Sequence, residues 1–181
     1  MALIRKIFLE LIWFLSEIEA HFAESSKDAL YLRRLYFRMR KVKHGQILFV
    51  GRDLRLLRDG NLVLGERCAL GDYVRIINHV PIVIGDDFLG SIGLHLETGA
   101  HEPITMAPTP QPIHIGNRVW CGINVTILAG VSIGDDVVIG AGSLVCKDIP
   151  SNSIAVGVPA KVIRPIVRDD VESLWSWVLP D

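Results

Sequence analysis

The first 45 residues have a helical hydrophobic pattern. Apolar residues recur there at steps of three and four, which is the spacing of one face of an amphipathic helix. This stripe consists of Leu3, Ile4, Ile7, Phe8, Leu11, Phe14, Leu15 and Ile18. The segment "AESSKDA" breaks the pattern, and Ser25 or Ser26 is suited to cap a second helix. The pattern therefore predicts an N-terminal helical cap over residues 1–45.

The second helical segment, "KDALYLRRLYFRMRKVKH", is strongly basic. Only Asp28 opposes its basic residues, which are Lys27, Arg33, Arg34, Arg38, Arg40, Lys41 and Lys43. One interpretation is a solvated helix face packed on the main body. The other is a basic surface that rests on anionic lipid at the inner membrane face, as a peripheral contact.

From residue 46 the helical spacing gives way to a period of six. Residues 115–150 read IGNRVW, CGINVT, ILAGVS, IGDDVV, IGAGSL and VCKDIP, with an aliphatic residue or cysteine first and glycine often second. Each unit predicts a short strand and a tight turn, with the first residue pointing inward. Three units would make one coil, as in blocks 64–81, 84–101, 115–132 and 133–150, with a two-residue slip at 82–83. Stacked coils bury their aliphatic ladders together and need caps at both ends. Four polar residues fit the turn corners and are assigned structural roles: Asp72, Asp86, Asn117 and Asp135.

Composition limits the partners and the cellular compartment that we expect. The 181 residues carry a net charge of −1, so no global charge draws the chain to nucleic acid. The three cysteines lack CxxC spacing, which favours a reducing compartment over a disulfide framework or a zinc ribbon. Charged residues interrupt the apolar N-terminus, and it has no small-residue cleavage site. We therefore expect a cytoplasmic protein.

The repeat stops at "TGAHEP", residues 98–103. The segment "EPITMAPTPQP", residues 102–112, then carries four of the nine prolines, which predicts a rigid loop that leaves the coil.

The repeat, the "TGAH" before the loop and the ending "AVGVPAKVIR" together resemble the hexapeptide-repeat acyltransferases. The similarity covers roughly residues 46–166, and it is greatest to maltose/galactoside and colanic-acid-type exopolysaccharide O-acetyltransferases. It implies a left-handed parallel β-helix over 46–166, with the N-terminal helical extension before it and a short C-terminal helix over 167–181. It further implies a homotrimer with active sites in the clefts between subunits and no metal. The implied reaction is acetyl transfer from acetyl-CoA to a sugar or glycan hydroxyl in polysaccharide biosynthesis. N-acetylation of an amino sugar or nucleotide-linked sugar remains an alternative.

The resemblance also implies roles for individual residues. His101 matches the histidine of the family's "TG…H" element and would be the general base that takes a proton from the acceptor. Glu102 is the adjacent acid, but neighbouring strand residues point opposite ways, so its role stays open. Asn78 and His79 stand near an acceptor-binding acid of the relatives and are candidate substrate contacts.

For acetyl-CoA, the resemblance carries over to a set of residues late in the chain. They would line the pantetheine arm, lie near the thioester or meet the phosphates. The set is Trp120, Gly122, Ile123, Ala141, Gly142, Cys146, Lys147, Lys161 and Arg164.

Two rival readings use the same fold. A γ-type carbonic anhydrase would need three zinc-binding histidines, for which His79, His95 and His101 are available. A non-catalytic trimeric scaffold would need no site at all.

Overall fold

The computed structural model describes residues 2–22 and 30–166. It contains two helices, α1 (Ala2–Phe22) and α2 (Leu30–Met39), followed by sixteen short strands. The proposed capping residues Ser25 and Ser26 and the proposed C-terminal helix lie outside the described residues.

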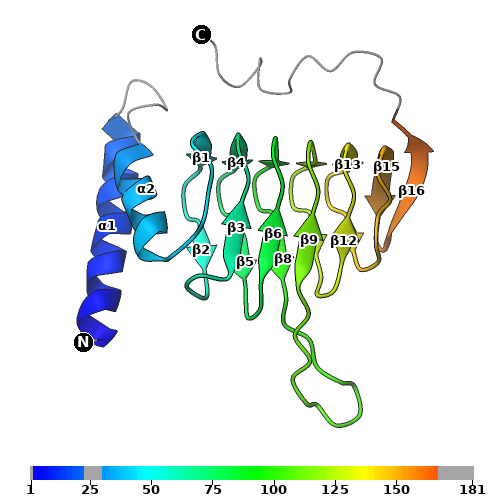
Figure 1. Cartoon of the computed structure of the whole chain (residues 1–181), viewed down its shortest axis with the longest axis horizontal. Coiled ribbons are helices and arrows are strands. Elements are labelled where there is room, and N and C mark those ends of the chain that lie inside the picture. Colours follow the sequence, from blue (N-terminus) through cyan, green and yellow to red (C-terminus); the bar gives the residue numbers. More distant parts are fainter. Residues whose placement is uncertain (1, 23–29, 167–181) are drawn as a thin grey trace.

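The strands form a parallel β-solenoid of three sheets that share about five coils (Figure 1). The first sheet joins β1 (Leu48–Val50), β4 (Cys68–Leu70), β7 (Leu89–Gly90), β10 (Trp120–Cys121), β13 (Val137–Ile139), β15 (Ser153–Gly157) and β16 (Ala160–Pro165). The second joins β2 (Arg55–Leu56), β5 (Arg75–Ile77), β8 (His95–Glu97), β11 (Thr126–Ile127) and β14 (Leu144–Val145). The third joins β3 (Leu62–Leu64), β6 (Ile82–Ile84), β9 (Ile113–Ile115) and β12 (Ser132–Ile133). Only β16 runs antiparallel to its neighbour, in a hairpin with β15 that ends the described solenoid.

The coils are not all of the expected eighteen residues. Leu64 pairs with Ile84, twenty positions on, whereas Trp120 pairs with Val138, eighteen positions on. The two extra residues of the earlier coils lie at one corner, between the second and third sheets, at residues 57–61 and 78–81. The two-residue slip seen in the sequence is therefore a wider corner.

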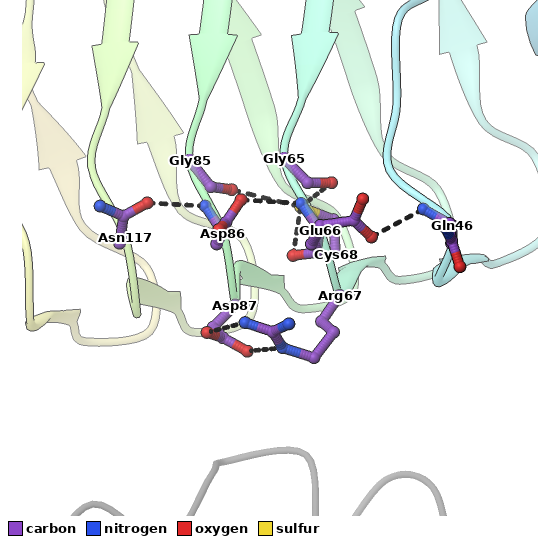
Figure 2. A network of polar contacts seen from close by, with 9 residues as sticks. All are labelled: Gln46, Gly65, Glu66, Arg67, Cys68, Gly85, Asp86, Asp87 and Asn117. Atoms are coloured by element: carbon purple, nitrogen blue, oxygen red, sulfur yellow. Dashed lines mark hydrogen bonds and ion pairs between the residues drawn. The ribbon is translucent and has the colours of Figure 1, made fainter.

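The first residue of each unit points into the solenoid as expected. Ile76, Leu96 and Ile127 form one such ladder, and all three are fully buried. At the corner after the third sheet, a side-chain oxygen in each coil accepts the backbone N–H of the matching residue one coil earlier. Glu66 accepts from Gln46, Asp86 from Glu66 and Asn117 from Asp86 (Figure 2). Since Asp135 continues the ladder by accepting from Asn117, the structural roles of Asp86, Asn117 and Asp135 are confirmed. Asp72 does the same at another corner, where it accepts from Arg52.

Two arginines of α2 and Arg40, which directly follows it, cap the first coil. Arg33 donates to the carbonyl of Val50, Arg34 to that of Gln46 and Arg40 to that of Leu56. Parallel strands at the end of a solenoid expose unpaired carbonyls, so these bonds protect the open edge. Three arginines of the basic segment are thus used against the solenoid. This observation favours the interpretation in which α2 packs on the main body.

Helix α1 has two apolar faces. Its inner face buries Leu9, Ile12 and Ser16, and Trp13 packs against Tyr36 of α2. All eight residues of the stripe that the sequence identifies point the other way, with exposed fractions between 40% and 73%. No helix within the described part of the chain is long and apolar enough to cross a membrane.

Candidate active site

The excursion at residues 98–112 is a paired hairpin. Gln111 N–H donates to Thr98 O, Thr109 N–H to Ala100 O, and Glu102 N–H to Ala107 O. Figure 1 shows it projecting from the solenoid at the corner after β8. Its tip is open to solvent, with Ile104 90% exposed. Backbone pairing and proline content together give the loop a defined shape, as the sequence suggests.

His101 lies on this hairpin, opposite Pro108, with its side chain exposed. Its Nδ1 is 2.8 Å from the carbonyl oxygen of Met106. A carbonyl oxygen only accepts hydrogen bonds, so Nδ1 of the neutral ring must carry the proton. Nε2 is then left with a lone pair that can accept a proton from a substrate. This arrangement holds the ring in the tautomer that a general base requires.

Glu102 shapes the turn that supplies the Met106 carbonyl. Its carboxylate accepts the backbone N–H groups of Ile104 and Thr105. These bonds, with Thr105 first in importance, lower the pKa of the Glu102 carboxyl. The structure shows no bond between Glu102 and His101, so a direct pairing in catalysis is not supported. Glu102 instead holds the loop around His101.

The two candidate acceptor contacts differ sharply. Asn78 is completely buried, accepts the N–H of Arg58 at 2.8 Å and donates to the Arg58 carbonyl at 3.0 Å. Its amide is therefore used within the wide corner, and the expectation that Asn78 contacts a substrate is wrong for its side chain in this conformation. His79 is exposed and remains a candidate.

A polar cluster surrounds His79. A side chain on Gly99 would meet the His79 ring at 3.2 Å, so the ring lies directly over the backbone that leads to His101. Glu97 accepts the N–H of Gly99 at 2.6 Å and lies 3.9 Å from Nε2 of His95. These residues come from two adjacent coils. The repeat alone does not place Glu97 and His95 beside His79, because nothing in it shows which coils stack.

Trp120 stands on the outer face of the first sheet and is 41% exposed. Its indole N–H donates to the Ser91 hydroxyl at 3.2 Å, a partner that sequence reasoning missed. The register Trp120–Val138–Ile154–Arg164 sets these residues in one row across four strands. At about 4.8 Å per strand, the row spans roughly 14 Å. It joins the indole to the basic hairpin at the end of the solenoid.

Next to this row the backbone of neighbouring coils packs closely, and one N–H group there has no hydrogen-bond acceptor within the described residues. A Cβ on Gly122 would meet the Ala141 nitrogen at 2.7 Å, so only glycine fits there. Within the described chain, the N–H of exposed Ile123 donates to no acceptor, while its carbonyl accepts from Gly142. Gly142 has a φ of +69° and open space where a Cβ would stand. The N–H of Ile123 is therefore an unpaired donor within the described chain, and the surface at Gly142 beside it is open.

The remaining predicted cofactor residues are solvent-exposed: Cys146, Lys147, Lys161 and Arg164. Lys161 and Arg164 both lie on β16. By contrast, burial raises the pKa of the Cys68 thiol to about 11 and that of Cys121 to about 12, which leaves them unreactive.

A cavity of about 460 Å³ lies elsewhere, between α1, α2 and the turn at residues 53–56. None of the predicted site residues lines it. Within the described residues of one chain, no group of three or more His, Cys, Asp or Glu is placed to hold a metal.

Comparison with known proteins decides the family. Residues 112–147 match the family described as bacterial transferase hexapeptide (six repeats). A solved galactoside acetyltransferase in complex with coenzyme A is 30% identical and superposes with a TM-score of 0.71, over 88% of this chain and 82% of that one. The protein belongs to the hexapeptide-repeat acyltransferases.

Other proteins that are similar to this hexapeptide-repeat protein are also named as acetyltransferases. A maltose O-acetyltransferase from Clostridium difficile 630 superposes with a TM-score of 0.76 at 28% identity, over 92% of this chain and 88% of that one. Among curated sequences, the galactoside O-acetyltransferase of Escherichia coli (strain K12) is 40% identical over 112 residues, which is 59% of this chain. A putative lipopolysaccharide biosynthesis O-acetyl transferase of the same organism is 33% identical over 129 residues, which is 64% of this chain and 66% of that protein. The match to the galactoside enzyme spans 55% of that enzyme's length.

Proposed function

We propose that the protein is an acetyl-CoA-dependent O-acetyltransferase that acts on a hydroxyl of a sugar or glycan in polysaccharide biosynthesis. The observation that carries this proposal is the His101–Met106 hydrogen bond, which leaves Nε2 as the basic nitrogen. The names of the galactoside, maltose and lipopolysaccharide O-acetyltransferases support the reaction class.

In the proposed reaction, Nε2 of His101 takes the proton of the acceptor hydroxyl as its oxygen attacks the thioester carbonyl. The resulting oxyanion needs a donor, and the unpaired N–H of Ile123 is available. When the carbon–sulfur bond breaks, the imidazolium returns its proton to the thiolate of coenzyme A. The products are an acetyl ester and free coenzyme A.

The exposed row on the first sheet fits the long arm of coenzyme A. Trp120 offers an aromatic wall at one end, and Lys161 and Arg164 offer charge-assisted donors for phosphates at the other. Gly122 and Gly142 have no side chain that would obstruct the arm between them. The arm would be bordered by Ala141, Cys146 and Lys147.

We infer that the working unit is a homotrimer. In a single chain His101 and the hairpin tip are open to water, whereas acyl transfer needs a site from which water is excluded. A neighbouring solenoid would close this side. The three free cysteines support a location in the cytoplasm.

The test is the release of coenzyme A from acetyl-CoA in the presence of sugars, oligosaccharides and nucleotide sugars. Because Cys146 is exposed and would react with a thiol reagent, the signal of enzyme without acetyl-CoA is subtracted. His101→Ala should lower the rate by about 10² to 10⁴. The control is His114→Ala, because His114 is also exposed but lies outward on β9. If His101→Ala kept the rate of the control, the assignment of the base would be wrong.

The product separates the two acceptor chemistries. An acetyl ester is cleaved by mild base, whereas an amide is stable. A base-stable product would therefore favour the alternative N-acetyltransferase activity.

A further inference from the structure

The outer face of the second sheet carries two arginines that lie side by side. Arg55 on β2 pairs in register with Arg75 on β5, and Arg75 pairs with His95 on β8. The residue that follows Arg75, Ile76, is buried inside the solenoid, so the side chains of this row point outward. Both arginines are exposed, and neither forms an ion pair or a side-chain hydrogen bond within the described residues.

Other arginines of the solenoid are neutralised by an acid of the next coil. Three such ion pairs lie at corners, with N···O distances between 2.6 and 2.8 Å: Arg52–Asp72, Arg67–Asp87 and Arg118–Asp136. Like charges that lie opposite each other on neighbouring strands destabilise a sheet. Because Arg55 and Arg75 have no such acid, a negative charge from outside the described chain would relieve their repulsion.

A pocket of about 230 Å³ lies at these two arginines, and its described lining residues are Asp53, Arg55, Tyr73 and Arg75. Guanidinium groups bind carboxylates and phosphates through charge-assisted hydrogen bonds. Tyr73 is 52% exposed and offers a flat ring against which a sugar ring can pack. The carboxylate of Asp53 forms no ion pair with either arginine in this part of the chain, so it can accept hydrogen bonds from sugar hydroxyl groups. The lining therefore suits a sugar that carries an anionic group.

The row leads to the hairpin that carries the proposed base. His95 begins β8, and His101 follows six residues later on the hairpin that leaves the solenoid directly after this strand (Figure 1). Six residues span at most about 20 Å, because an extended chain advances about 3.3 Å per residue. The ring of His79, two residues beyond β5, lies over Gly99 on the same path. The pocket and the base can therefore contact different parts of one acceptor molecule.

We propose that Arg55 and Arg75 bind an anionic group of the acceptor, either a carboxylate or a phosphate. The substrate class would then be acidic glycans or sugars linked to phosphate. This inference rests on the proposed acetyl transfer and adds the charge of the acceptor to it. The two arginines would determine specificity, because they hold a part of the acceptor away from the hydroxyl that reacts at His101.

The test compares probes that differ in charge. Trigalacturonate is paired with its carboxyl-reduced, neutral trisaccharide, and galactose 1-phosphate is paired with methyl galactoside. Binding to the full chain is measured by calorimetry in the presence of coenzyme A. We expect the wild type to bind one anionic probe about tenfold or more tightly than its neutral counterpart. Arg55→Gln/Arg75→Gln should lose this preference and keep its affinity for the neutral probe. The control is Arg38→Gln, which removes an exposed arginine of α2 and should bind like the wild type.

The pair of probes that shows the preference identifies the anionic group. The proposal is wrong if neither anionic probe binds more tightly than its neutral counterpart, or if the double variant keeps the preference. A lower solution mass of the double variant, measured by light scattering, would also overturn it, because the arginines would then pair with an acid of a second copy. Release of coenzyme A is measured separately. Arginine-dependent binding of an anionic probe without any release would support the anion site and count against the proposed reaction, so the two failures are distinguishable.

Discussion

Replacement of Asn78 separates a structural role from a role in acceptor binding. The structure buries its amide completely and pairs both ends of it with the backbone of Arg58, at 2.8 and 3.0 Å. Asn78→Ala would leave one N–H and one C=O of Arg58 without these partners. Each lost hydrogen bond costs about 0.5–1.5 kcal/mol net, and truncating the fully buried Asn78 side chain adds to this loss. We therefore expect a loss of roughly 2–4 kcal/mol in the free energy of unfolding.

The assay is thermal unfolding together with acceptor kinetics. For a chain of this length each kcal/mol shifts Tm by about 2–4 °C, so the Tm of Asn78→Ala should fall by roughly 5–15 °C. The matched control is His79→Ala, since His79 is the next residue and is exposed. It should change stability by less than about 0.5 kcal/mol. A stable Asn78→Ala protein with a raised acceptor KM would refute the structural reading and restore Asn78 as a substrate contact.

Three further outcomes are expected. Glu102→Ala should lower kcat by less than His101→Ala does, because the carboxylate only supports the turn whose carbonyl orients the ring; equal losses in the two variants would instead make Glu102 a direct participant. In labelling with a thiol reagent at pH 8, only Cys146 should react before unfolding, as mass spectrometry would show, since the other two thiols are buried. The raised pKa values of Cys68 and Cys121 favour the folded state while both thiols are neutral, so their contribution to stability is full below about pH 8.5 and is lost as the pH rises toward 11 to 12; unfolding curves at pH 8 and pH 11 would show no loss if burial did not raise these values.

The solenoid could be predicted from the sequence because its core residues recur with a period of six. Within the repeat the inward positions are mostly aliphatic at every sixth residue, and ladders such as Ile76–Leu96–Ile127 keep that chemical type although the coils differ in length, so local pattern and global packing agree. The turn residues Asp86 and Asn117 could be assigned for the same reason. The orientation of α1 could not be predicted. Its sequence has apolar residues on both faces, and periodicity shows which residues share a face but not which face is covered.

The candidate site was predictable only where a side chain carries the signal. His101 stands at the point where the repeat breaks, so the sequence marks it. Its partner is the carbonyl of Met106, and a backbone acceptor leaves no trace in residue type. The prediction that the Asn78 side chain contacts the substrate went wrong for a related reason. A polar residue beside a histidine suggests a surface site, whereas the wider corner turns this amide inward against Arg58.

That corner connects the fold with the site. Asn78 fixes it in the second coil, and one coil later the buried hydroxyl of Thr98 donates to Ile77 O and accepts the N–H of Val80. The hairpin that carries His101 departs directly after Thr98, at the same corner. The extra residues of the earlier coils thus build a polar, hydrogen-bonded base under the excursion. Loosening that base should disturb the hairpin before it disturbs the aliphatic ladders, because the ladders do not pass through this corner. In Asn78→Ala we therefore expect backbone hydrogen exchange to rise first in residues 98–112, and an early rise in β9 or β12 would contradict this order.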